Sequence, residues 1–351
     1  MSHAASAASP FQVRLEPSGR SYPLDDAETV LAGGIRHGIN LPYGCKDGAC
    51  GSCKCQKLSG QVRHGPHQSK ALSEDEEAQG WVLTCCASAL SDLVLQVQQV
   101  GSQGMFACKK VPTRVSLLER KSPDVMRLLL QLPASEPLQY HAGQYIDFLL
   151  PGGQRRSYSM ACAPHRVREG LELHVRHMPG GLFTDLVFGA MKERDILRIE
   201  GPFGSFYLRD SAKPIILLAS GTGFAPAKAL LEHLQFTGSQ RQVALYWGGR
   251  RPSDLYMDDW VQQLLPALPT LRYVPVVSDA LAQDHWHGRT GLVHLALLQD
   301  QPDLHMHQVY ACGAPAMVEA ARRDFLAAGL PADEFFADAF TSAADKLAAP
   351  T

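Results

Sequence analysis

Four cysteines are the residues of this 351-residue chain whose type and spacing most clearly specify chemistry. Cys45, Cys50 and Cys53 are separated by four and then two residues, and Cys85 follows after 31 more. The spacing is typical of a 2Fe–2S cluster, in which two ferric ions bridged by sulfide are held by four thiolates. Glycines between the first three cysteines let the backbone wrap closely and turn its N–H groups toward the sulfurs. We therefore predict that these four cysteines are the metal ligands.

A structural zinc site is the alternative for these thiols, because C-x2-C is also half of a zinc knuckle. The chain has no second C-x2-C pair, and the glycine-rich C-x4-C segment does not suit a zinc ribbon. Two further thiols crowd the site, since Cys55 lies two residues beyond Cys53 and Cys86 adjoins Cys85. We choose Cys85 as the ligand because it completes a Leu83-x-Cys85 ending, and the roles of Cys55 and Cys86 stay open.

The elements around the cysteines are expected to form one small domain. Residues 11–15 and 21–24 predict a hairpin, residues 29–37 a helix, and residues 54–58 and 93–97 further strands. Ser73 and Glu76 have the spacing of a helix capping box. With the cysteine spacing, this order resembles the β-grasp fold of plant-type ferredoxins.

A second motif, Arg155-Arg156-Ser157-Tyr158-Ser159, lies among short strands whose spacing indicates an antiparallel barrel. The sequences at 179–184 and 200–204 follow it. In this order, the three motifs resemble the flavin-binding barrel of the ferredoxin–NADP reductase superfamily. The residue types suit that role, because arginine can clasp a pyrophosphate, tyrosine can stack on isoalloxazine and serine can meet flavin N5.

The resemblance assigns six residues to FAD binding, with Ser159 also beside the path of the hydride. They are Arg156, Tyr158, Ser159, Gly180, Gly181 and Thr184. A Gly-Gly turn before a helix N-terminus also offers backbone N–H groups to phosphate. The alternative is that Arg156 and Tyr158 form an ordinary strand pair with a surface salt bridge.

A third region begins with the apolar run 214–219, as expected of a parallel strand buried on both faces. Gly221, Thr222 and Gly223 follow, and then a helical pattern of apolar residues. Strand, glycine turn and helix form a nucleotide-binding unit, with the pyrophosphate at the turn. Further alternation of strands and helices predicts a parallel, doubly wound sheet. The G-T-G-x-A-P form of the turn resembles the pyridine-nucleotide domain of the same superfamily.

The resemblance also implies roles for three residues near the nicotinamide end. It places Cys312 beside nicotinamide C4 as a catalytic residue, with a plain buried cysteine as the alternative. It places Phe340 over the isoalloxazine face, with Asp338 nearby as a polar contact. Asp279 stands where NADP-dependent relatives carry an arginine, and its carboxylate would repel a 2′-phosphate, so NADH is favoured over NADPH. Arg250 and Arg251 argue in the opposite direction.

Composition limits the possible functions. A formal charge of −2 without a lysine-rich stripe argues against nucleic-acid binding. The apolar runs are far shorter than the roughly 20 residues of a membrane span. The first ten residues lack the pattern of a secretion signal, and the nine cysteines include cluster spacing, so we expect a reducing cytoplasm.

We expect a multidomain protein of α+β and α/β classes. Its predicted parts are a flexible tail (1–10), a β-grasp ferredoxin domain (11–100), a linker (101–107), an antiparallel FAD-binding barrel (108–210) and a doubly wound NAD-binding domain (211–351). This order resembles the single-chain NADH-dependent iron–sulfur flavoprotein reductases, and the motifs are most similar to the CDP-6-deoxy-Δ3,4-glucoseen reductase type.

The resemblance implies electron transfer from NADH through FAD and the cluster to a partner protein. The partner would be a deoxysugar dehydratase or an oxygenase or monooxygenase component, and the sequence does not choose between them. Two alternatives stay open: a redox-sensing iron–sulfur module, and a reductase for a separate ferredoxin.

Overall fold

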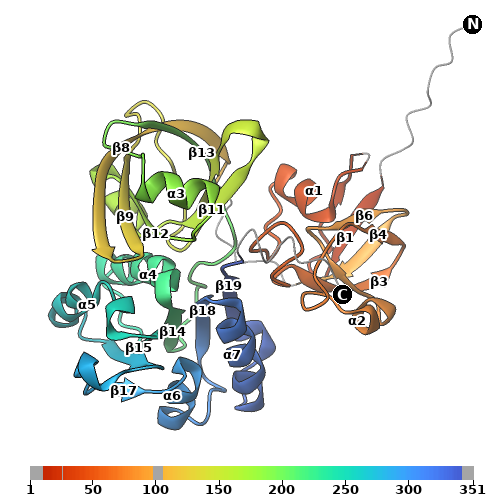
Figure 1. Cartoon of the computed structure of the whole chain (residues 1–351). Helices are drawn as coiled ribbons and strands as arrows, with labels where there is room; N and C mark the ends of the chain where they lie inside the picture. The colour runs from red at the N-terminus through yellow and green to blue at the C-terminus, as the bar shows by residue number, and fades with distance from the viewer. Residues whose placement is uncertain (1–10, 26, 98–105, 342–351) are drawn as a thin grey trace, which may run out of the picture. The chain divides into compact units, whose positions relative to one another are not determined.

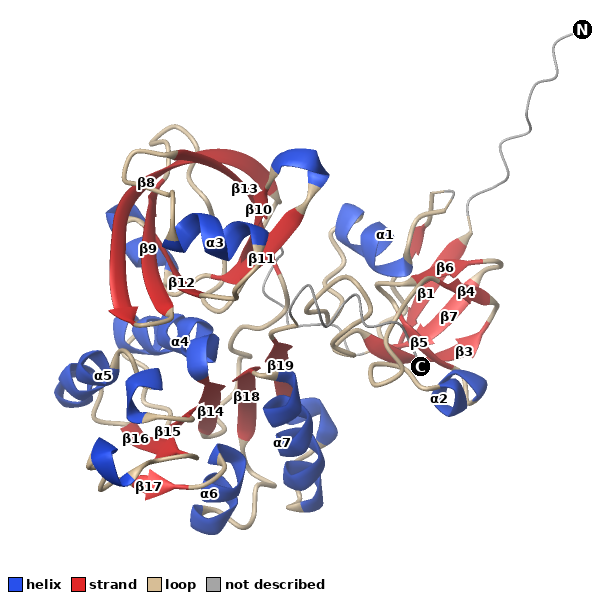
Figure 2. Ribbon diagram, viewed as in Figure 1, coloured by secondary structure: helices blue, strands red, loops and turns tan. Residues whose placement is uncertain are grey.

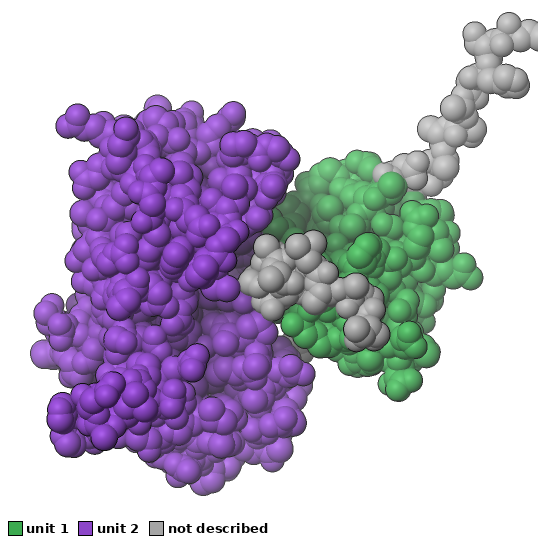
Figure 3. All heavy atoms as spheres, in the orientation of Figure 1, with its two compact units in different colours: residues 1–105, 341–351 green, residues 106–340 purple. Residues whose placement is uncertain are grey.

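The computed structural model describes residues 11–25, 27–97 and 106–341 and divides into two compact units (Figures 1 and 3). One unit is built from residues 1–105 and 341–351, and the other from Phe106–Phe340. The tail predicted at 1–10 and residues 101–105 of the predicted linker lie outside the described residues. Each unit is described by itself below.

The first unit contains a five-stranded sheet with the order β2-β1-β7-β3-β5 and a two-stranded sheet of β4 and β6 (Figure 2). Its strands are β1 (Gln12–Glu16), β2 (Ser21–Pro23), β3 (Lys54–Ser59), β4 (Val62–His64), β5 (Trp81–Leu83), β6 (Ala87–Ala89) and β7 (Leu93–Gln96). Its helices are α1 (Val30–Arg36) and α2 (Glu74–Ala78). Strands β1 and β7 are parallel and the other pairs are antiparallel. This mixed sheet with its helix confirms the predicted β-grasp fold.

Local chemistry explains how the two helices of this unit are held. The Tyr22 hydroxyl on β2 donates to the Val30 carbonyl at 2.8 Å, which fixes the start of α1 against the sheet. Helix α2 begins with the predicted capping box, since Ser73 accepts from the Glu76 N–H and Glu76 accepts from the Ser73 N–H. Both helices are short, so these contacts are needed to define their ends.

The second unit begins with a six-stranded antiparallel sheet in the order β11-β10-β13-β8-β9-β12. Its strands are β8 (Lys109–Ser122), β9 (Val125–Gln131), β10 (Tyr145–Leu149), β11 (Arg155–Ser159), β12 (Leu171–Arg176) and β13 (Ile196–Phe203), with helix α3 (Leu182–Phe188) after β12. Met160, directly after β11, bridges to Leu173 of β12 and so connects the two edge strands. The predicted antiparallel barrel is confirmed.

The chain then forms a parallel sheet in the order β17-β16-β15-β14-β18-β19. Its strands are β14 (Ile215–Ser220), β15 (Val243–Gly249), β16 (Leu271–Val277), β17 (Arg289–Thr290), β18 (Gln308–Gly313) and β19 (Phe335–Ala339). Its helices are α4 (Phe224–Phe236), α5 (Asp258–Leu264), α6 (Val293–Asp300) and α7 (Pro315–Ala327). This is the predicted doubly wound sheet.

Two separate apolar cores cover the faces of the parallel sheet. Side chains of α4 and α5 pack on one face with Leu217 and Leu245, and those of α6 and α7 pack on the other with Ile216 and Leu218. The chain order reverses at β14, with β15 on one side and β18 on the other. Ligands of such sheets bind at the carboxyl ends of the strands beside this reversal.

No described helix is long and apolar enough to cross a membrane.

Gly143 lies two residues before β10 and packs closely against the backbone at Phe206. Its φ is +97°, and an added Cβ would lie 2.3 Å from the Phe206 carbonyl oxygen. We predict that Gly143→Ala lowers the thermal midpoint of the unit by about 6 °C or more, followed by circular dichroism. The control is Gly152→Ala, which has a φ of +72° and nothing within 4 Å of its Cβ, so it carries the backbone strain without the collision. Equal shifts in the two variants would contradict the prediction.

Candidate functional site

The four predicted cluster thiols lie together as two pairs. The Sγ atoms of Cys53 and Cys85 are 3.2 Å apart, which is contact rather than a disulfide. The N–H of Cys45 donates to Cys50 Sγ at 3.4 Å. Cys53 stands immediately before β3 and Cys85 two residues after β5, and the pairing of these strands brings the distant cysteine to the loop.

The paired arrangement suits a binuclear cluster better than a single ion. A structural zinc needs four ligands on one centre, whereas each iron of a 2Fe–2S cluster takes two of the four thiolates. The loop is also tight, because a Cβ on Gly44 would lie 3.2 Å from Cys50 Sγ. The residues present therefore fit a 2Fe–2S cluster.

The two extra thiols occupy different surroundings. Cys55 is buried on β3, where its residue pairs with Val82 of β5. Cys86 Sγ lies 3.6 Å from Cys85 Sγ and 3.6 Å from the Pro66 carbonyl oxygen. Cys86 thus faces the segment after β4, while Cys85 faces Cys53.

Strand β11 arranges the predicted flavin residues. Arg156 and Tyr158 lie two residues apart and therefore share one face of the strand. Arg156 donates to the Arg155 carbonyl and to Gln154 Oε1, whereas Arg155 makes the ion pairs, with Asp147 and Glu200. The surface salt bridge considered for Arg156 thus belongs to Arg155.

The Tyr158 ring contacts two aromatic side chains of the second unit. The Tyr158 ring packs against Phe148 and Phe183, with centroid distances of 5.7 and 5.2 Å. Burial raises the pKa of the Tyr158 phenol, so the ring stays neutral. A neutral aromatic face beside a guanidinium fits an isoalloxazine with its pyrophosphate.

The Gly-Gly turn leads directly into α3. Gly181 is the N-cap of the helix and Gly180 has a φ of +80°. The Thr184 hydroxyl closes the turn by donating to the Met178 carbonyl at 2.8 Å and accepting from the Met178 N–H at 3.2 Å. A Cβ on Gly181 would lie 2.5 Å from Thr184 Oγ1, so the turn requires glycine there. Thr184 shapes the turn in addition to any contact with phosphate.

The nucleotide turn forms a short 3-10 segment, Gly221–Gly223, between β14 and α4. The Trp247 indole donates to the Gly221 carbonyl at 3.0 Å and holds the first residue of the turn. A Cβ on Gly223 would lie 2.2 Å from the Cys312 carbonyl oxygen, so this glycine allows β18 to approach the turn. Thr222, between the two buried glycines, is partly exposed at the carboxyl end of the sheet.

Cys312 is buried at the end of β18, with 1% of its surface exposed. Its thiol donates to the Gly223 carbonyl at 2.8 Å and so supports the nucleotide turn. Burial, with the Asp338 carboxylate nearby, holds the pKa of the Cys312 thiol well above its usual range. The group is therefore a neutral thiol, suited to packing beside a nicotinamide ring rather than to nucleophilic attack.

One hydrogen bond joins the flavin strand to the nucleotide sheet. The Ser159 hydroxyl, at the end of β11, donates to Asp338 Oδ2 on β19 at 3.1 Å, and both side chains are buried. Asp338 is the register partner of Cys312 in the pairing of β19 with β18. Phe340 follows β19, and its N–H donates to the Gly313 carbonyl at 2.8 Å. The structure thus brings Ser159, Cys312 and Phe340 to the same carboxyl edge of the sheet.

Asp279 lies at the same edge, after β16, beside the arginines that follow β15. Arg250 Nη2 is 3.9 Å from Asp279 Oδ2, with the two side chains 81% and 56% exposed, so both are open to a ligand. Arg251 instead turns toward Asp284 at 3.3 Å and donates to the Asp279 carbonyl at 2.9 Å. Of the two arginines, Arg250 is therefore the one whose exposed side chain lies beside the Asp279 carboxylate.

Sequence reasoning missed Arg176, the last residue of β12. Its guanidinium is held by Asp124 at 2.6 Å and by Asp254 at 3.1 Å. It lies against the nucleotide turn, because a Cβ on Gly221 would be 2.7 Å from Arg176 Nη1. A guanidinium from the barrel, paired with two carboxylates, therefore lies beside the turn. The sequence feature that could have identified Arg176 is its place directly before the segment 177–181, which leads to the Gly-Gly turn.

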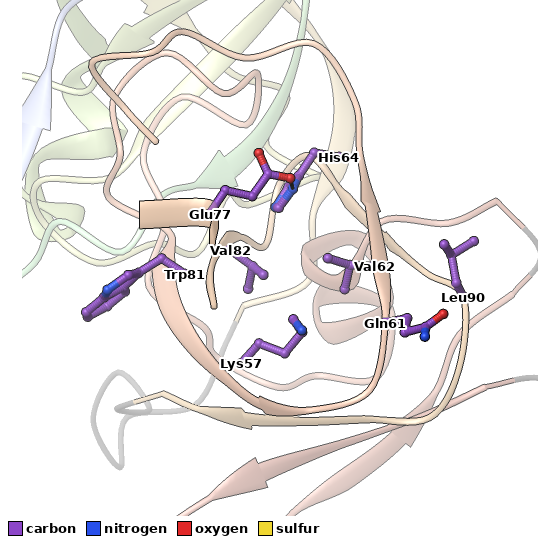
Figure 4. Close-up of a pocket in the computed structure, with 8 residues that line it drawn as sticks. All are labelled: Lys57, Gln61, Val62, His64, Glu77, Trp81, Val82 and Leu90. Carbon is purple, nitrogen blue, oxygen red and sulfur yellow. Dashed lines mark hydrogen bonds and ion pairs between the residues drawn. The ribbon is translucent and has the colours of Figure 1, made fainter. Parts of the chain in front are cut away.

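A separate hollow lies on the first unit, away from these motifs (Figure 4). It is lined by Lys57, Gln61, Val62, His64, Glu77, Trp81, Val82 and Leu90. His64 Nδ1 and Glu77 Oε1 are 2.6 Å apart at its side. Lys57 is four residues along β3 from Cys53, or about 13 Å of extended strand. The hollow therefore does not include the thiol pairs.

Comparison with known proteins agrees with this division. The chain matches the family models of the 2Fe-2S iron-sulfur cluster binding domain over residues 13–90, the oxidoreductase FAD-binding domain over 112–207 and the oxidoreductase NAD-binding domain over 217–323. A CDP-6-deoxy-L-threo-D-glycero-4-hexulose-3-dehydrase reductase from Yersinia pseudotuberculosis is 42% identical over 94% of this chain and 98% of its own. The chain belongs to the iron–sulfur flavoprotein reductases.

Other members of this reductase family serve different systems. Terephthalate 1,2-dioxygenase reductase component 2 from Comamonas is 36% identical over 94% of this chain and 97% of its own. The crystal structure of an Amycolatopsis cytochrome P450 reductase has a TM-score of 0.77 and 33% identity, covering 95% of this chain and 99% of that one. The reductase described here transfers electrons from a reduced nicotinamide nucleotide through FAD and a 2Fe–2S cluster to a partner protein.

The two neighbouring thiols at the end of β5 provide a test of the ligand set. We predict that Cys85→Ser abolishes the native visible and electron paramagnetic resonance spectra of the cluster, because Cys85 faces Cys53. The matched control Cys86→Ser removes a thiol one residue away and is expected to leave both spectra unchanged. The opposite result would make Cys86 the fourth ligand.

Proposed function

We propose that this reductase oxidises NADH and delivers electrons singly to a partner enzyme, through the residues assigned above. NADH supplies a hydride, FAD accepts two electrons and releases them one at a time, and the 2Fe–2S cluster carries single electrons. The observation that supports the proposal is the contact between Ser159 and Asp338, the register partner of Cys312. It holds the end of the flavin strand beside the carboxyl edge where nicotinamide binds in this fold.

The chain's own groups have distinct tasks in this proposal. Arg156 and Tyr158 bind the flavin on their shared face of β11, and the turn of Gly180, Gly181 and Thr184 supplies backbone N–H groups to its phosphates. A second glycine turn does the same for NADH, with the residues Gly221, Thr222 and Gly223.

Three side chains are proposed to act near the reacting rings. The Ser159 hydroxyl is fixed by Asp338 and offers a polar contact to flavin N5, while the neutral Cys312 thiol packs beside the nicotinamide. Phe340, which is partly buried beyond β19, shields the site from water until the nicotinamide enters.

The donor and acceptor follow from charge and from the relatives. Asp279 favours the 2′-hydroxyl of NADH over the 2′-phosphate of NADPH. The acceptor is a deoxysugar dehydratase or an oxygenase component, because relatives named for both systems match nearly the whole chain. The dehydratase is favoured, since that relative is 42% identical against 36% for the dioxygenase component.

The domain boundaries and the compartment belong to the same proposal. We place the ferredoxin domain at 11–100, the FAD barrel at 108–210 and the NAD domain at 211–351, joined by a linker at 101–107. The family models at 13–90, 112–207 and 217–323 fall inside these ranges. A reducing cytoplasm is supported by nine cysteines without a disulfide.

Anaerobic titration with NADH tests the proposed function. The visible absorbance of both flavin and cluster is expected to bleach within one turnover, and NADH-driven reduction of cytochrome c should then proceed steadily. The cluster-deficient Cys85→Ser variant should still show flavin bleaching. An oxidised holoprotein left unchanged by both NADH and NADPH would refute the proposal.

The nucleotide preference has its own test. We predict that Asp279→Ser lowers the KM for NADPH about five- to tenfold, because the exposed carboxylate no longer repels the 2′-phosphate, and raises the KM for NADH. The control Asp303→Ser removes the same charge before β18, at the opposite edge of the sheet, and should leave both constants unchanged. Similar NADPH constants for Asp279→Ser and wild type would contradict the role of Asp279.

A further inference from the structure

A buried ammonium lies where the FAD barrel packs against the nucleotide-binding sheet within the second unit. Lys228, on α4, has 3% of its surface exposed. Its Nζ is 2.6 Å from Glu232 Oε1, 3.0 Å from the Ala161 carbonyl oxygen and 3.3 Å from Glu172 Oε1. The ammonium thus donates two hydrogen bonds, to Glu232 and to the Ala161 carbonyl, and forms an ion pair with Glu172. The Trp260 ring covers it at 4.9 Å.

Lys228 belongs to a group of opposite charges that pair with one another. Glu172 also accepts from Arg127 at 3.0 Å and contacts His174 Nε2 at 2.9 Å. Burial lowers the pKa of His174, so its ring is neutral, with Tyr256 2.8 Å from the other ring nitrogen. Burial opposes ionisation of Glu172, but the contacts with His174 and Lys228 outweigh it and lower its pKa. Lys228 and Arg127 thus both pair with Glu172, Lys228 also pairs with Glu232, and the partly exposed Arg127 also pairs with Glu119. Such pairing offsets the cost of burying the Lys228 charge.

The contacts of this group connect two elements of the electron path. Ala161 and Ala163 lie two and four residues after Ser159, on the exit of the flavin strand. Lys228 donates to the Ala161 carbonyl, and Glu232 Oε2 accepts from the Ala163 N–H at 2.8 Å. Lys228 and Glu232 are one turn apart on α4, the helix that starts at the nucleotide turn. One face of the nucleotide helix is thereby tied to the backbone that follows the flavin strand.

We propose that Lys228 and Glu232 are positioning residues for hydride transfer, which act by fixing the nucleotide helix relative to the flavin strand. The inference rests on the proposed function and goes beyond it, because neither residue belongs to a cofactor motif. Hydride transfer needs the reacting atoms about 3–3.5 Å apart, and a displacement of about 1 Å costs roughly a hundredfold in rate. Buried, directional hydrogen bonds from Lys228 and to Glu232 resist such a displacement, whereas apolar packing permits sliding.

The test variant removes the pair without leaving a charge unpaired. Lys228→Met/Glu232→Gln deletes one cation and one anion, and the glutamine keeps an acceptor for the Ala163 N–H. We expect the limiting rate of flavin reduction by saturating NADH, measured by stopped flow, to fall about tenfold or more. The NADH dissociation constant, the FAD content and the rate of reduction by dithionite should stay within twofold of wild type.

Two further measurements separate positioning from a general loss of stability. Hydrogen exchange of the amides at 160–163 should become faster in the variant, while exchange in the strands of the barrel stays unchanged. NADH deuterated at C4 should show an isotope effect on the slowed step, so that the measured rate is that of hydride transfer.

The matched control is another Lys–Glu pair of the nucleotide sheet. Lys213 precedes β14 and Glu334 precedes β19, and their side chains are 2.6 Å apart. Among the described residues, this ion pair involves no strand of the barrel. Lys213→Met/Glu334→Gln makes the same chemical change and should leave the rate of flavin reduction within twofold.

Each remaining outcome has a defined meaning. An unchanged rate in the Lys228 variant, or a loss of rate that only parallels loss of FAD, would overturn the positioning role. If that variant does not fold, Glu232→Gln is measured by the same criteria, since its amide oxygen keeps one acceptor and Lys228 keeps its contacts with the Ala161 carbonyl and Glu172. Failure of the wild-type flavin to bleach with NADH would refute the proposed function instead, whatever the variants do.

Discussion

Hydride transfer constrains this structure, because two rings held by two different folds must meet within about 3–3.5 Å. The flavin motif lies on an antiparallel barrel and the nucleotide turn on a parallel sheet. Buried polar contacts join the two: Ser159 with Asp338, and Lys228 with the backbone after the flavin strand. Such contacts are directional, so they determine orientation as well as proximity. The remaining packing of the unit leaves the side chains of these contacts largely buried.

A different physical constraint determines the positions of the cluster thiols. They need only converge in a small volume, and a tight loop with one distant cysteine achieves this through the pairing of β3 and β5. The result is two pairs of thiols, which suits two irons. Glycine is needed where the loop folds onto itself, since a Cβ on Gly48 would lie 2.7 Å from Cys86 Sγ. The loop is therefore packed directly against Cys86, the extra thiol, which lies 3.6 Å from Cys85.

Much of the fold could be predicted because its signals are local. The strand expected at 54–58 is β3 (Lys54–Ser59), and the capping box of Ser73 begins α2. The helix after the nucleotide turn was predicted from its apolar spacing, but the same pattern says nothing of its charged residues. Lys228 and Glu232 are buried because α4 contacts the barrel as well as its own sheet. The spacing of apolar residues along a helix does not show whether its charged face also contacts another domain.

The sequence by itself determined the cofactor classes, because cysteine spacing and glycine turns encode the backbone geometry that clusters and phosphates need. It also determined the order of the domains. Tertiary structure decided which residues meet: Ser159 and Asp338 are 179 positions apart, and Lys228 and Ala161 are 67 apart. Their partnership depends on how a barrel and a sheet pack together. Burial then makes such pairs obligatory, since an unpaired charge in that dry boundary would be strongly destabilising.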